Sequence, residues 1–598
     1  MGAVRAEPVE ARPELVGGLA PGTGTSTSSA RAVLLCVAAL LLASCATGLG
    51  ERSAPLASAD PKAGCESLKG HEIGASLITW PGQRSGHATV TSATYHAASE
   101  LSVADRAPTP AAAITPALPA HCRLVGRIAP VDPKADPIQF QVNLPLAWNG
   151  RSVQFGGGGF NGVLISGLAL VPGARYDAAA PLAQGYVTVG TDSGHQNRPG
   201  VSPMAFAANE EMLLNFAYQA YPKVRNVSAE LMKRAYGRAP EYLYFVGSSE
   251  GGREGLTMAQ RYPAAFNGIF ARVPVIQWTG LMYSFVRNGV ALSGDGWLAP
   301  AQVKLVHDAV LAACDAADGV ADRIVSNTEA CRATFDPGSL QCPGAGAAAV
   351  QGANCLSPAQ VRAVRTLRSP LRFPFALANG LIEYPGWGIG GEDTPAPGGP
   401  TGGWRAWWSG NTAPTTPPSA GNATQWVYGS GAAQHFFARD PNADPRRVTP
   451  EQFAEWTKVI SSIMDSTSPD LGGFAARGHK LIVLEYMSDY AQSPYAGLQY
   501  GDAVKRHMGA GAAAQFMRVY AAPGVDHVGT GAPALVDMLR ALSTWVERQE
   551  APINLVLAEQ DVKPPFTVRR TRPLCEWPKW TRYKGGDANQ AASFECVN

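Results

Sequence analysis

Hydrophobic and polar positions follow two alternating patterns in the first half of the chain. Residues 210–237 carry apolar positions at three- and four-residue spacing, which is typical of an amphipathic helix, and residues 252–263 repeat this spacing up to Pro263. Short apolar runs bounded by turn residues predict strands at 122–131, 138–145, 152–159, 185–192 and 242–246. Strands that alternate with helices predict an α/β fold with a parallel sheet.

The pattern changes between residues 276 and 470, where the chain is rich in Gly, Pro, Trp, Asn and Thr. This composition is unfavourable for a sheet and favours an inserted lid domain. The α/β pattern then returns, with strands predicted at 480–486 and 514–524 and helices near 500–509 and at 532–549. We therefore predict a core in two parts, 65–275 and 471–598, which are separated by a lid domain at 276–470.

Residues 1–45 have the pattern of a signal peptide. Arg31 precedes a short apolar run that is too brief to span a bilayer and ends in small residues. Leu42–Cys45 resembles a bacterial lipobox, and cleavage before Cys45 would leave that cysteine to be acylated; an ordinary signal peptide is the alternative. Residues 46–64 are expected to form a flexible tether. We expect an exported protein, either a periplasmic or outer-membrane lipoprotein or a secreted protein.

Charge and cysteine content limit the classes of binding partner and the cellular compartment that the sequence indicates. The 598 residues carry a net charge of +2, with no basic stripe or acidic tail, so neither nucleic acid nor an obligate protein partner is indicated. Eight of the ten cysteines lie outside the signal segment without CxxC spacing, and in an oxidising compartment they predict four disulfides. Proximity in the sequence favours Cys314–Cys331, Cys342–Cys355 and Cys575–Cys596, which leaves Cys65–Cys122, although proximity does not prove the connectivity.

A candidate nucleophile follows the predicted strand at 242–246. Gly247–Gly251 matches G-x-S-x-G, the pattern of a nucleophile on a sharp strand-to-helix turn. The pattern alone is weak, because a chain of this length and glycine content contains it by chance about half the time. A serine in an ordinary glycine-rich loop is therefore the competing interpretation of Ser249.

The order of the remaining chemistry supports the catalytic interpretation. In an α/β-hydrolase the acid and then the histidine follow the nucleophile, each after a strand. Asp489 follows the predicted strand 480–486, and His527 follows the last predicted strand. Asp502 and Glu485 are alternative acids but fall in a helix and a strand, and His507 falls in a helical run. The predicted triad is therefore Ser249, Asp489 and His527.

The chemistry of ester hydrolysis explains the residue types of the predicted triad and its neighbours. A serine hydroxyl is a poor nucleophile at neutral pH, so His527 would accept its proton while Asp489 holds the imidazole tautomer. Glu250 would contribute its backbone N–H to an oxyanion hole, and Gly156–Gly159 would contribute a second N–H. A flexible turn or a phosphate loop is the alternative for this glycine run, but no lysine follows it as a phosphate loop requires.

An acidic cluster lies in the predicted lid, in the sequence "CDAADGVADRI". Asp315, Asp318 and Asp322 place three carboxylates over one short turn, and the carbonyl groups of Val320 and Ile324 lie between and beside them. Such oxygen ligands suit Ca²⁺, although the loop is not an EF-hand because the glutamate at the twelfth position is absent. A solvated acidic turn is the alternative.

Together these segments resemble the tannase and feruloyl esterase family of secreted α/β-hydrolases, from about Cys65 to the C-terminus. The matching stretches are "LPLAWNGR", "GGGGFNG", "TDSGH", "YFVGSSEGGREGLTMAQRYPAAFNGI", "CDAADGVADRI", "GWRAWWSG", "SPDLGGFAARG" and "RTRPLCEWPKWTRYKG". The resemblance implies an α/β-hydrolase core with a large inserted lid domain that shapes the acyl pocket. It also agrees with the four cysteine pairs given above.

The resemblance implies a role for each candidate site residue. It gives Ser249, Asp489 and His527 as the triad, and the Gly159 and Glu250 N–H groups as the oxyanion hole. It gives structural Ca²⁺ as the cofactor. The implied calcium ligands are Asp315, Asp318, Val320, Asp322 and Ile324, and the expected substrate contacts are Gly158, Trp407, Gln425 and Trp426.

The chain departs from the family at two places. Related chains carry a cysteine before the nucleophile and another after the catalytic histidine, joined as a disulfide, whereas this chain has Ser248 and Val528. We expect packing and hydrogen bonds to replace that cross-link, whose loss would otherwise cost about 2–4 kcal/mol. In the lid, a family member that hydrolyses a terephthalate monoester holds the free carboxylate with an arginine, and the matching region here offers Gln425 and Trp426 but no arginine.

These departures favour a secreted serine esterase for hydroxylated aromatic acids, feruloyl- or galloyl-like, because burying an unpaired carboxylate is costly. Hydrolysis of a terephthalate monoester is the alternative within the same chemistry. An acyltransferase with the same triad, and a non-catalytic lipoprotein that binds aromatic esters, are two further alternatives. The sequence does not distinguish the natural ester or its leaving alcohol.

Overall fold

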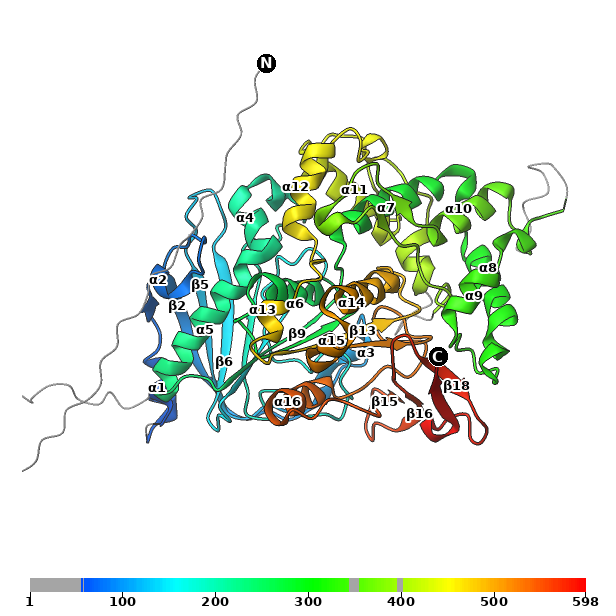
Figure 1. The fold of residues 1–598 in the computed structure, drawn as a ribbon. Coiled ribbons are helices and arrows are strands. Elements are labelled where there is room, and N and C mark those ends of the chain that lie inside the picture. The colour runs from blue at the N-terminus through cyan, green and yellow to red at the C-terminus, as the bar shows by residue number, and fades with distance from the viewer. Residues whose placement is uncertain (1–54, 58, 344–353, 395–401) are drawn as a thin grey trace, which may run out of the picture. The chain divides into compact units, whose positions relative to one another are not determined.

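A mixed sheet of 11 strands forms the centre of the fold (Figure 1). The computed structural model describes residues 55–57, 59–343, 354–394 and 402–598. In spatial order the strands are β1 (Glu72–Ile73), β2 (Ala88–His96), β5 (His121–Ile128), β6 (Ile138–Pro145), β8 (Val187–Thr191), β7 (Arg151–Phe155), β9 (Tyr242–Ser248), β10 (Gly268–Arg272), β13 (Lys480–Tyr486), β14 (Met517–Ala522) and β17 (Cys575–Glu576).

Six neighbouring strands, from β8 to β14, are parallel to one another, and the strands that flank them are antiparallel. The central runs are buried on both faces, as parallel strands in such folds are. Phe245 belongs to the core on one face of β9, whereas Tyr244 and Val246 belong to the core on the other. The carboxyl ends of β7, β9, β13 and β14 meet at one edge, so the loops after these strands are brought together.

Helices cover both faces of the sheet. One face carries α1 (Pro61–Glu66), α5 (Ala220–Tyr236), α6 (Glu250–Arg261), α14 (Pro494–Met508) and α15 (Ala510–Phe516), and the other carries α16 (Met538–Arg548). The segment predicted as one helix at 210–237 is α4 (Glu210–Leu214), a π-helical turn (Asn215–Gln219) and α5. Gly237, with φ 73°, ends α5 in the left-handed conformation that glycine tolerates.

No strand of the large sheet lies between residues 273 and 479 of the described chain. This segment instead builds a separate helical core around Trp278, Trp387 and Trp408. In Figure 1 most of its helices are gathered above α14 and β13. They are α7 (Trp278–Ala291), α8 (Pro300–Cys314), α9 (Thr328–Thr334), α10 (Pro358–Arg368), α11 (Thr424–Ala432) and α12 (Ala454–Met464), with one short hairpin, β11 (Leu371–Arg372) and β12 (Glu383–Tyr384).

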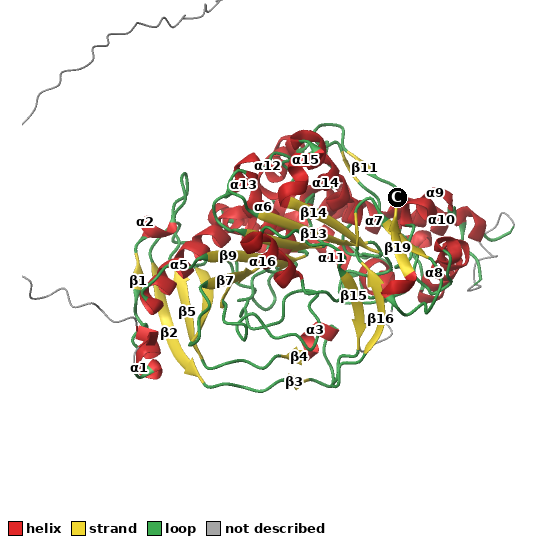
Figure 2. Cartoon of the chain, turned by 60° about the horizontal axis from the view of Figure 1, so that its bottom comes forward, coloured by secondary structure: helices red, strands yellow, loops and turns green. Residues whose placement is uncertain are grey.

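Smaller elements complete the chain. Figure 2 shows β3, β4 and α3 on the long connection after β2, and β15 and β16 as a separate hairpin. The remaining elements are α2 (Ala75–Ile78), β3 (Ser102–Val103), α3 (Pro110–Ala113), β4 (Ile114–Thr115), α13 (Gly472–Ala475), β15 (Val556–Gln560), β16 (Val568–Pro573), β18 (Trp580–Tyr583) and β19 (Phe594–Val597).

The four predicted disulfides are confirmed. Each pair is bonded and has a Cα–Cα distance of 5.0 to 5.6 Å, within the usual range. They are Cys65–Cys122, Cys314–Cys331, Cys342–Cys355 and Cys575–Cys596.

The α/β prediction is confirmed, but several details differ. The sheet is mixed rather than parallel, because the predicted strands 122–131 and 138–145 form β5 and β6, which pair antiparallel with each other and with β2 and β8. The predicted tether overlaps α1, which begins at Pro61 because the Asp60 side chain accepts hydrogen bonds from the first helical N–H groups. The last predicted helix begins at Met538 rather than 532, capped by the Asp537 side chain. The signal segment and the lipobox lie outside the described residues, and no described helix is long and apolar enough to cross a membrane.

Candidate active site

Ser249 lies on a strained turn between β9 and α6. Its backbone has φ 61° and ψ −121°, a conformation that is rare for residues other than glycine. Four backbone groups hold it there, including the Arg253 N–H, which donates to the Ser249 carbonyl at 3.2 Å. The Ser249 N–H donates to the Arg272 carbonyl at 3.0 Å, and the Ser249 carbonyl accepts from Gly252 N–H at 3.0 Å and Val275 N–H at 3.2 Å. Strain maintained by its surroundings is typical of a catalytic nucleophile.

Glycines around this turn are required by close approach. A Cβ on Gly247 would lie 2.1 Å from the Gly251 carbonyl oxygen, and a Cβ on Gly251 would lie 2.7 Å from the Gly157 carbonyl oxygen. A Cβ on Gly156 would lie 2.6 Å from the Gly251 Cα. The strand, the helix and the glycine loop after β7 therefore pack backbone against backbone, as the sequence pattern predicts.

His527 and Asp489 form a pair at the carboxyl edge of the sheet. The two side chains meet at 2.7 Å, where His527 Nδ1–H donates to Asp489 Oδ2. Asp489 is only 2% exposed, and its Oδ1 accepts from the N–H groups of Ala491 at 2.6 Å and Gln492 at 3.0 Å. This carboxylate is therefore fixed and placed to orient the imidazole.

The neighbouring Asp526 shapes the histidine loop, and the sequence analysis did not identify it. It is buried, and its Oδ1 accepts from the N–H groups of Val528 at 3.2 Å and Thr530 at 2.8 Å. These bonds close a tight turn with His527 inside it. An aspartate directly before a loop histidine, with Gly and Thr after it, was the available signal.

Ser249 and His527 line the same cavity of about 250 Å³. Its other lining residues are mostly aromatic and aliphatic, and they come from the glycine loop, the helical lid and the Asp489 loop. They are Gly158, Gly159, Phe160, Glu250, Val275, Trp278, Leu281, Met282, Phe285, Trp407, Tyr428 and Ala491. An apolar cavity with few polar groups beside a nucleophile suits an aromatic acyl group.

Two of the four predicted substrate contacts lie at this cavity, and two do not. Gly158 and Trp407 line it, with the Trp407 ring 6.3 Å from the His527 ring. Gln425 and Trp426 are 0% and 1% exposed and are not among the residues that line this cavity, so the structure does not bring them to it, and a substrate contact at these two residues stays a prediction. Both residues begin α11, and the inward face of that helix presents Tyr428 instead.

The glycine loop places one free amide beside the nucleophile. Gly157 N–H donates to Glu254 Oε2 at 2.9 Å, and Gly158 N–H donates to Asn161 Oδ1 at 2.8 Å. No partner for the Gly159 N–H is found in the part of the chain that the structure describes. Gly159 has φ 59°, so this left-handed position favours glycine.

Buried acids fix both sides of the oxyanion region. The Glu250 side chain is paired with Arg253 at 2.8 Å, and its backbone N–H lies at the start of α6, where no helical carbonyl accepts it. Glu254 joins α6 to the glycine loop, because its Oε1 also accepts from Asn161 Nδ2 at 2.6 Å. Burial, with the adjacent Glu250 charge, raises the pKa of Glu254 to about 8.

His195, from the "TDSGH" stretch, supports the same loop from behind. Its Nε2–H donates to the Phe160 carbonyl at 2.8 Å, and its ring stacks on Phe206 at 3.7 Å. Burial lowers the pKa of His195 to about 4, so the ring is neutral at physiological pH. The sequence stretch was recognised as part of the resemblance, but its contact with the glycine loop was not predicted.

The predicted calcium loop is ordered mainly by its own hydrogen bonds. Asp315 accepts from the N–H groups of Asp322 at 3.1 Å, Arg323 at 3.0 Å and Ile324 at 3.2 Å, and Asp322 pairs with Arg572. Within the described residues, no group of three His, Cys, Asp or Glu side chains is arranged to hold a metal.

One atom of this loop nevertheless fits a cation. Asp318 is 2% exposed, and no hydrogen-bond partner for its Oδ2 is found among the described residues. Burial and the charges of Asp322 and Asp315 raise the pKa of Asp318. A hard cation would satisfy that oxygen and relieve the repulsion between the carboxylates.

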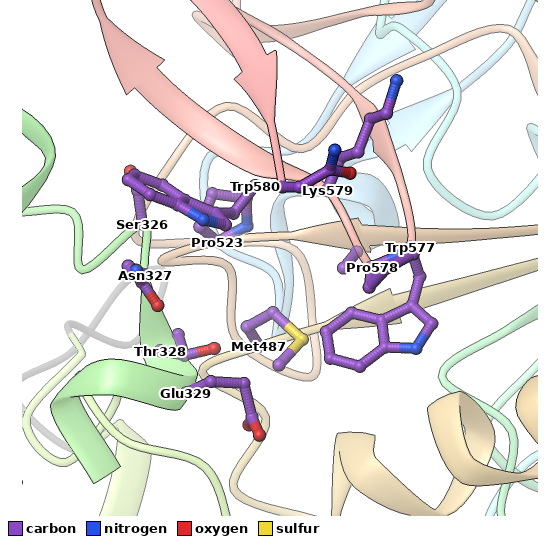
Figure 3. Close-up of a pocket in the computed structure, with 12 residues that line it drawn as sticks. Ser326, Asn327, Thr328, Glu329, Met487, Pro523, Trp577, Pro578, Lys579 and Trp580 are labelled. Carbon is purple, nitrogen blue, oxygen red and sulfur yellow. The ribbon is translucent and has the colours of Figure 1, made fainter. Parts of the chain in front are cut away.

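A second cavity, of about 330 Å³, lies beyond the Asp489 loop (Figure 3). Its walls include Met487, Pro523, Trp577 and Trp580, and its polar groups include Glu329. The Trp577 ring is held by Nε1–H, which donates to Asp502 Oδ2 at 3.2 Å. Its twelve lining residues include Ser326 and Thr328 but no histidine, so they provide no serine–histidine pair.

Comparison with known proteins places this chain among ester hydrolases. The profile described as "Tannase and feruloyl esterase" matches residues 122–597. The chain is 34% identical over 507 residues to the uncharacterized esterase Atu5261 of Agrobacterium fabrum, covering 80% of this chain and 86% of that protein. It is 34% identical over 608 residues to the mono(2-hydroxyethyl) terephthalate hydrolase of Piscinibacter sakaiensis, covering 91% of this chain and 92% of that protein.

Comparison with solved structures concerns the fold alone. Feruloyl esterase B from Aspergillus oryzae is similar in structure, with a TM-score of 0.70 at 24% identity over 90% of this chain and 100% of that chain. This similarity supports the α/β-hydrolase fold. The profile match over most of the chain, together with the two long alignments, shows a carboxylic ester hydrolase. The chain belongs to the tannase and feruloyl esterase family.

Proposed function

We propose that Ser249 is the nucleophile of a Ser–His–Asp triad with His527 and Asp489. The observation that carries this proposal is the cavity shared by the strained Ser249 and by His527, whose other nitrogen is held by the buried Asp489. His527 takes the proton from the Ser249 hydroxyl as it attacks the ester carbonyl. The imidazolium is stabilised by Asp489, and it returns the proton to the departing alkoxide. Water then attacks the carbonyl of the acyl-enzyme while His527 takes its proton, and His527 returns that proton to the Ser249 oxygen as the acyl–oxygen bond breaks and the acid leaves.

The oxyanion is bound by the N–H groups of Gly159 and Glu250 in this proposal. Both residues line the cavity beside Ser249. The unpartnered Gly159 N–H and the start of α6 at Glu250 supply two donors that do not need to reorganise during the reaction. Glu254 keeps them in register, since it links α6 to the glycine loop.

The substrates proposed are esters of hydroxylated aromatic acids. The aromatic ring of the acyl group packs among Trp278, Phe285 and Trp407. The Tyr428 hydroxyl lies close to Gly159, at 3.0 Å from the position that a Cβ on this glycine would take. Tyr428 lines the cavity, so its hydroxyl can donate or accept a hydrogen bond there. The described lining residues include no lysine or arginine, so a free carboxylate on the acyl group would be buried without a cation.

A panel of esters tests this assignment. We expect kcat/KM on methyl ferulate or methyl gallate to exceed that on mono(2-hydroxyethyl) terephthalate by at least about tenfold, because an unpaired buried charge costs more than 1 kcal/mol. A preference for the terephthalate monoester would favour the activity named for the Piscinibacter sakaiensis relative instead.

Labelling by a fluorophosphonate probe tests the nucleophile separately, and folded protein that is never labelled would favour a non-catalytic binder. Products formed with added alcohol distinguish a hydrolase from an acyltransferase.

We also propose that Ca²⁺ binds the loop of Asp315, Asp318 and Asp322, with the carbonyl groups of Val320 and Ile324. The unpartnered Asp318 oxygen supports this. Binding would require Asp322 to exchange its pairing with Arg572 for the cation. The ion would have a structural role.

Export with a lipid on Cys45 remains a proposal that the signal pattern supports. The four disulfides of the described chain agree with an oxidising compartment. Cell fractionation of wild type and Cys45→Ala tests it. Membrane-bound wild type and soluble variant are expected, whereas equal solubility of the two proteins would contradict lipidation.

A further inference from the structure

Arg272 lies directly behind the nucleophile turn. It is the last residue of β10 and pairs in register with Ser248 on β9 and with Leu484 on β13. Its carbonyl accepts the Ser249 N–H at 3.0 Å. The next residue, Val273, is buried and β-branched yet has φ 39°, so the backbone here is strained on both sides of that hydrogen bond.

The Arg272 side chain adds a second contact to the same turn. Its Nε–H donates to the Ser248 hydroxyl at 2.9 Å. Its guanidinium carbon lies 5.3 Å from the centre of the Tyr486 ring, and the Tyr486 hydroxyl donates to the Ala534 carbonyl at 3.2 Å. Ser248 and Tyr486 are uncharged side chains. A hydrogen bond and an aromatic contact therefore hold the guanidinium group, and neither of these partners forms an ion pair with it.

The same side chain reaches the other two parts of the site. A methyl group at Gly529, two residues after His527, would lie 3.6 Å from Arg272 Nη1. Tyr486, under the guanidinium, accepts the Asp489 N–H at its carbonyl oxygen at 3.0 Å. One half-buried arginine therefore contacts the nucleophile turn and the strand that leads to the acid, and its guanidinium group lies next to Gly529 in the loop of the histidine.

We propose that Arg272 is a positioning residue for ester hydrolysis, which keeps the strained Ser249 turn aligned with the His527 loop. The inference rests on the proposed role of Ser249 as nucleophile. It assigns a specific residue to the non-covalent connection expected where related chains have a disulfide and this chain has Ser248 and Val528. Arg272 reaches the nucleophile turn through its hydrogen bond to Ser248, and it reaches the segment after His527 through Tyr486, whose hydroxyl donates to the Ala534 carbonyl; neither Arg272 nor Tyr486 is among the lining residues of the cavity.

The test compares Arg272→Met with wild type in kcat, KM, melting temperature and the second-order rate of fluorophosphonate labelling. We expect kcat to fall about 10- to 100-fold, because small misplacements of reacting groups have such effects, while KM changes less than about twofold. Labelling should slow in parallel. Arg518→Met is the matched control, because Arg518 also packs on an aromatic ring, that of Trp545 at 5.0 Å, but near the amino end of β14. It should keep the wild-type kcat.

Ser248 variants decide the question independently if Arg272→Met does not fold. Ser248→Ala should lower kcat about 3- to 10-fold, the effect of one hydrogen bond, and Ser248→Thr, which keeps the hydroxyl, should restore it. In the Arg272→Met background, Ser248→Ala should cause little further loss of kcat.

The proposal is overturned by wild-type kcat in Arg272→Met and Ser248→Ala, by an equal loss of kcat in Arg518→Met, or by a change in KM alone. If wild type itself is not labelled by the probe, the proposed nucleophile is wrong; if it is labelled and the variants match it, only the role of Arg272 is wrong.

Discussion

Two cavities lie on either side of the short segment Met487–Asp489, and they differ in chemistry more than in size. Met487 lines the cavity of about 330 Å³ in Figure 3, whereas Asp489 holds the histidine of the cavity of about 250 Å³. Both are largely apolar and both have tryptophan in their walls. Both also contain serine among their described lining residues, so neither volume, apolar character nor the presence of a hydroxyl identifies the catalytic one.

The difference is in how the serine is held. In the cavity proposed to be catalytic the Ser249 backbone is strained, is fixed by hydrogen bonds to Arg272 and Val275, and shares the cavity with a histidine whose Nδ1 is paired with Asp489. In the second cavity Ser326 lies on the segment that leads into α9, and the described lining residues offer it no histidine. Convergence of groups that can move one proton is therefore the property that marks an active site in this fold.

The largest expected effect is the loss of activity in Ser249→Ala. Removing the nucleophile of a triad should lower kcat by about 10⁴-fold or more, since only the oxyanion donors and substrate binding remain. Trp577→Ala, in the second cavity, should leave kcat within about twofold. Ester hydrolysis and active-site labelling measure both variants. Comparable losses of kcat in the two variants would mean that the two cavities do not differ in function.

Asp489→Asn should give the next largest effect. The amide keeps the size of the side chain but no longer stabilises the imidazolium or the required tautomer, so kcat should fall about 10³- to 10⁴-fold. Asp502→Asn is the matched control, because Asp502 holds Trp577 of the second cavity. Its kcat should stay close to that of wild type. Equal losses of kcat in Asp489→Asn and Asp502→Asn would mean that Asp489 supports the local structure and does not act on His527.

Trp407→Ala should have a smaller effect, mainly on KM. The ring lies 6.3 Å from His527 and 5.8 Å from Tyr428, so its removal takes away part of the surface that packs on the acyl ring. We expect KM for methyl ferulate to rise about tenfold. Trp426→Phe provides the contrast, since Trp426 is buried away from the cavity and should not change KM. The opposite result would restore the earlier prediction for Trp426.

The part of this site that the sequence predicted is the part set by local pattern. Gly247–Gly251 after an apolar run predicts the nucleophile turn, because only glycine allows the backbone contacts that the structure contains. The order of strands predicts Asp489 and His527 for a similar reason, since loops after parallel strands share an edge. The disulfides followed from an even count of cysteines and short spacings.

What the sequence did not predict depends on tertiary contacts. Glu254 and Arg272 have ordinary local surroundings in the sequence, and their roles arise only when α6 packs on the glycine loop and when β10 pairs with β9 and β13. The placement of Gln425 and Trp426 away from the cavity has a similar cause. Trp426 and Tyr428 are two residues apart on α11 and therefore point to different faces of the helix, and the sequence alone did not show which face lies at the cavity.

Calcium should affect the second cavity more than the catalytic one. The Asp315–Ile324 loop continues into Ser326 and Asn327 on the wall of the second cavity. A site saturated at 100 times its Kd adds about 2.7 kcal/mol, so a chelator should lower the melting temperature by about 2 °C and added Ca²⁺ should restore it. Asp318→Asn should lose this response, and Asp308→Asn, an exposed acid on α8, should keep it. A chelator without effect on wild type would contradict the calcium proposal.

The smallest expected effect is a pH dependence of stability that comes from Glu254 beside the catalytic cavity. Its folded pKa of about 8 lies above the ordinary 4.5, so its stabilising contribution is fully present below pH 4.5 and is lost as the pH rises through 8. Relative to Glu254→Gln, the melting temperature of wild type should therefore decline between pH 5 and pH 9 by about 1–3 °C. Glu329→Gln, which removes an exposed carboxylate of the second cavity, is the matched control, and its difference from wild type should not vary with pH in this way. A wild-type curve parallel to that of Glu254→Gln would mean that Glu254 is ionised throughout, held by Arg253 and the Gly157 N–H, and that the link between α6 and the glycine loop does not titrate.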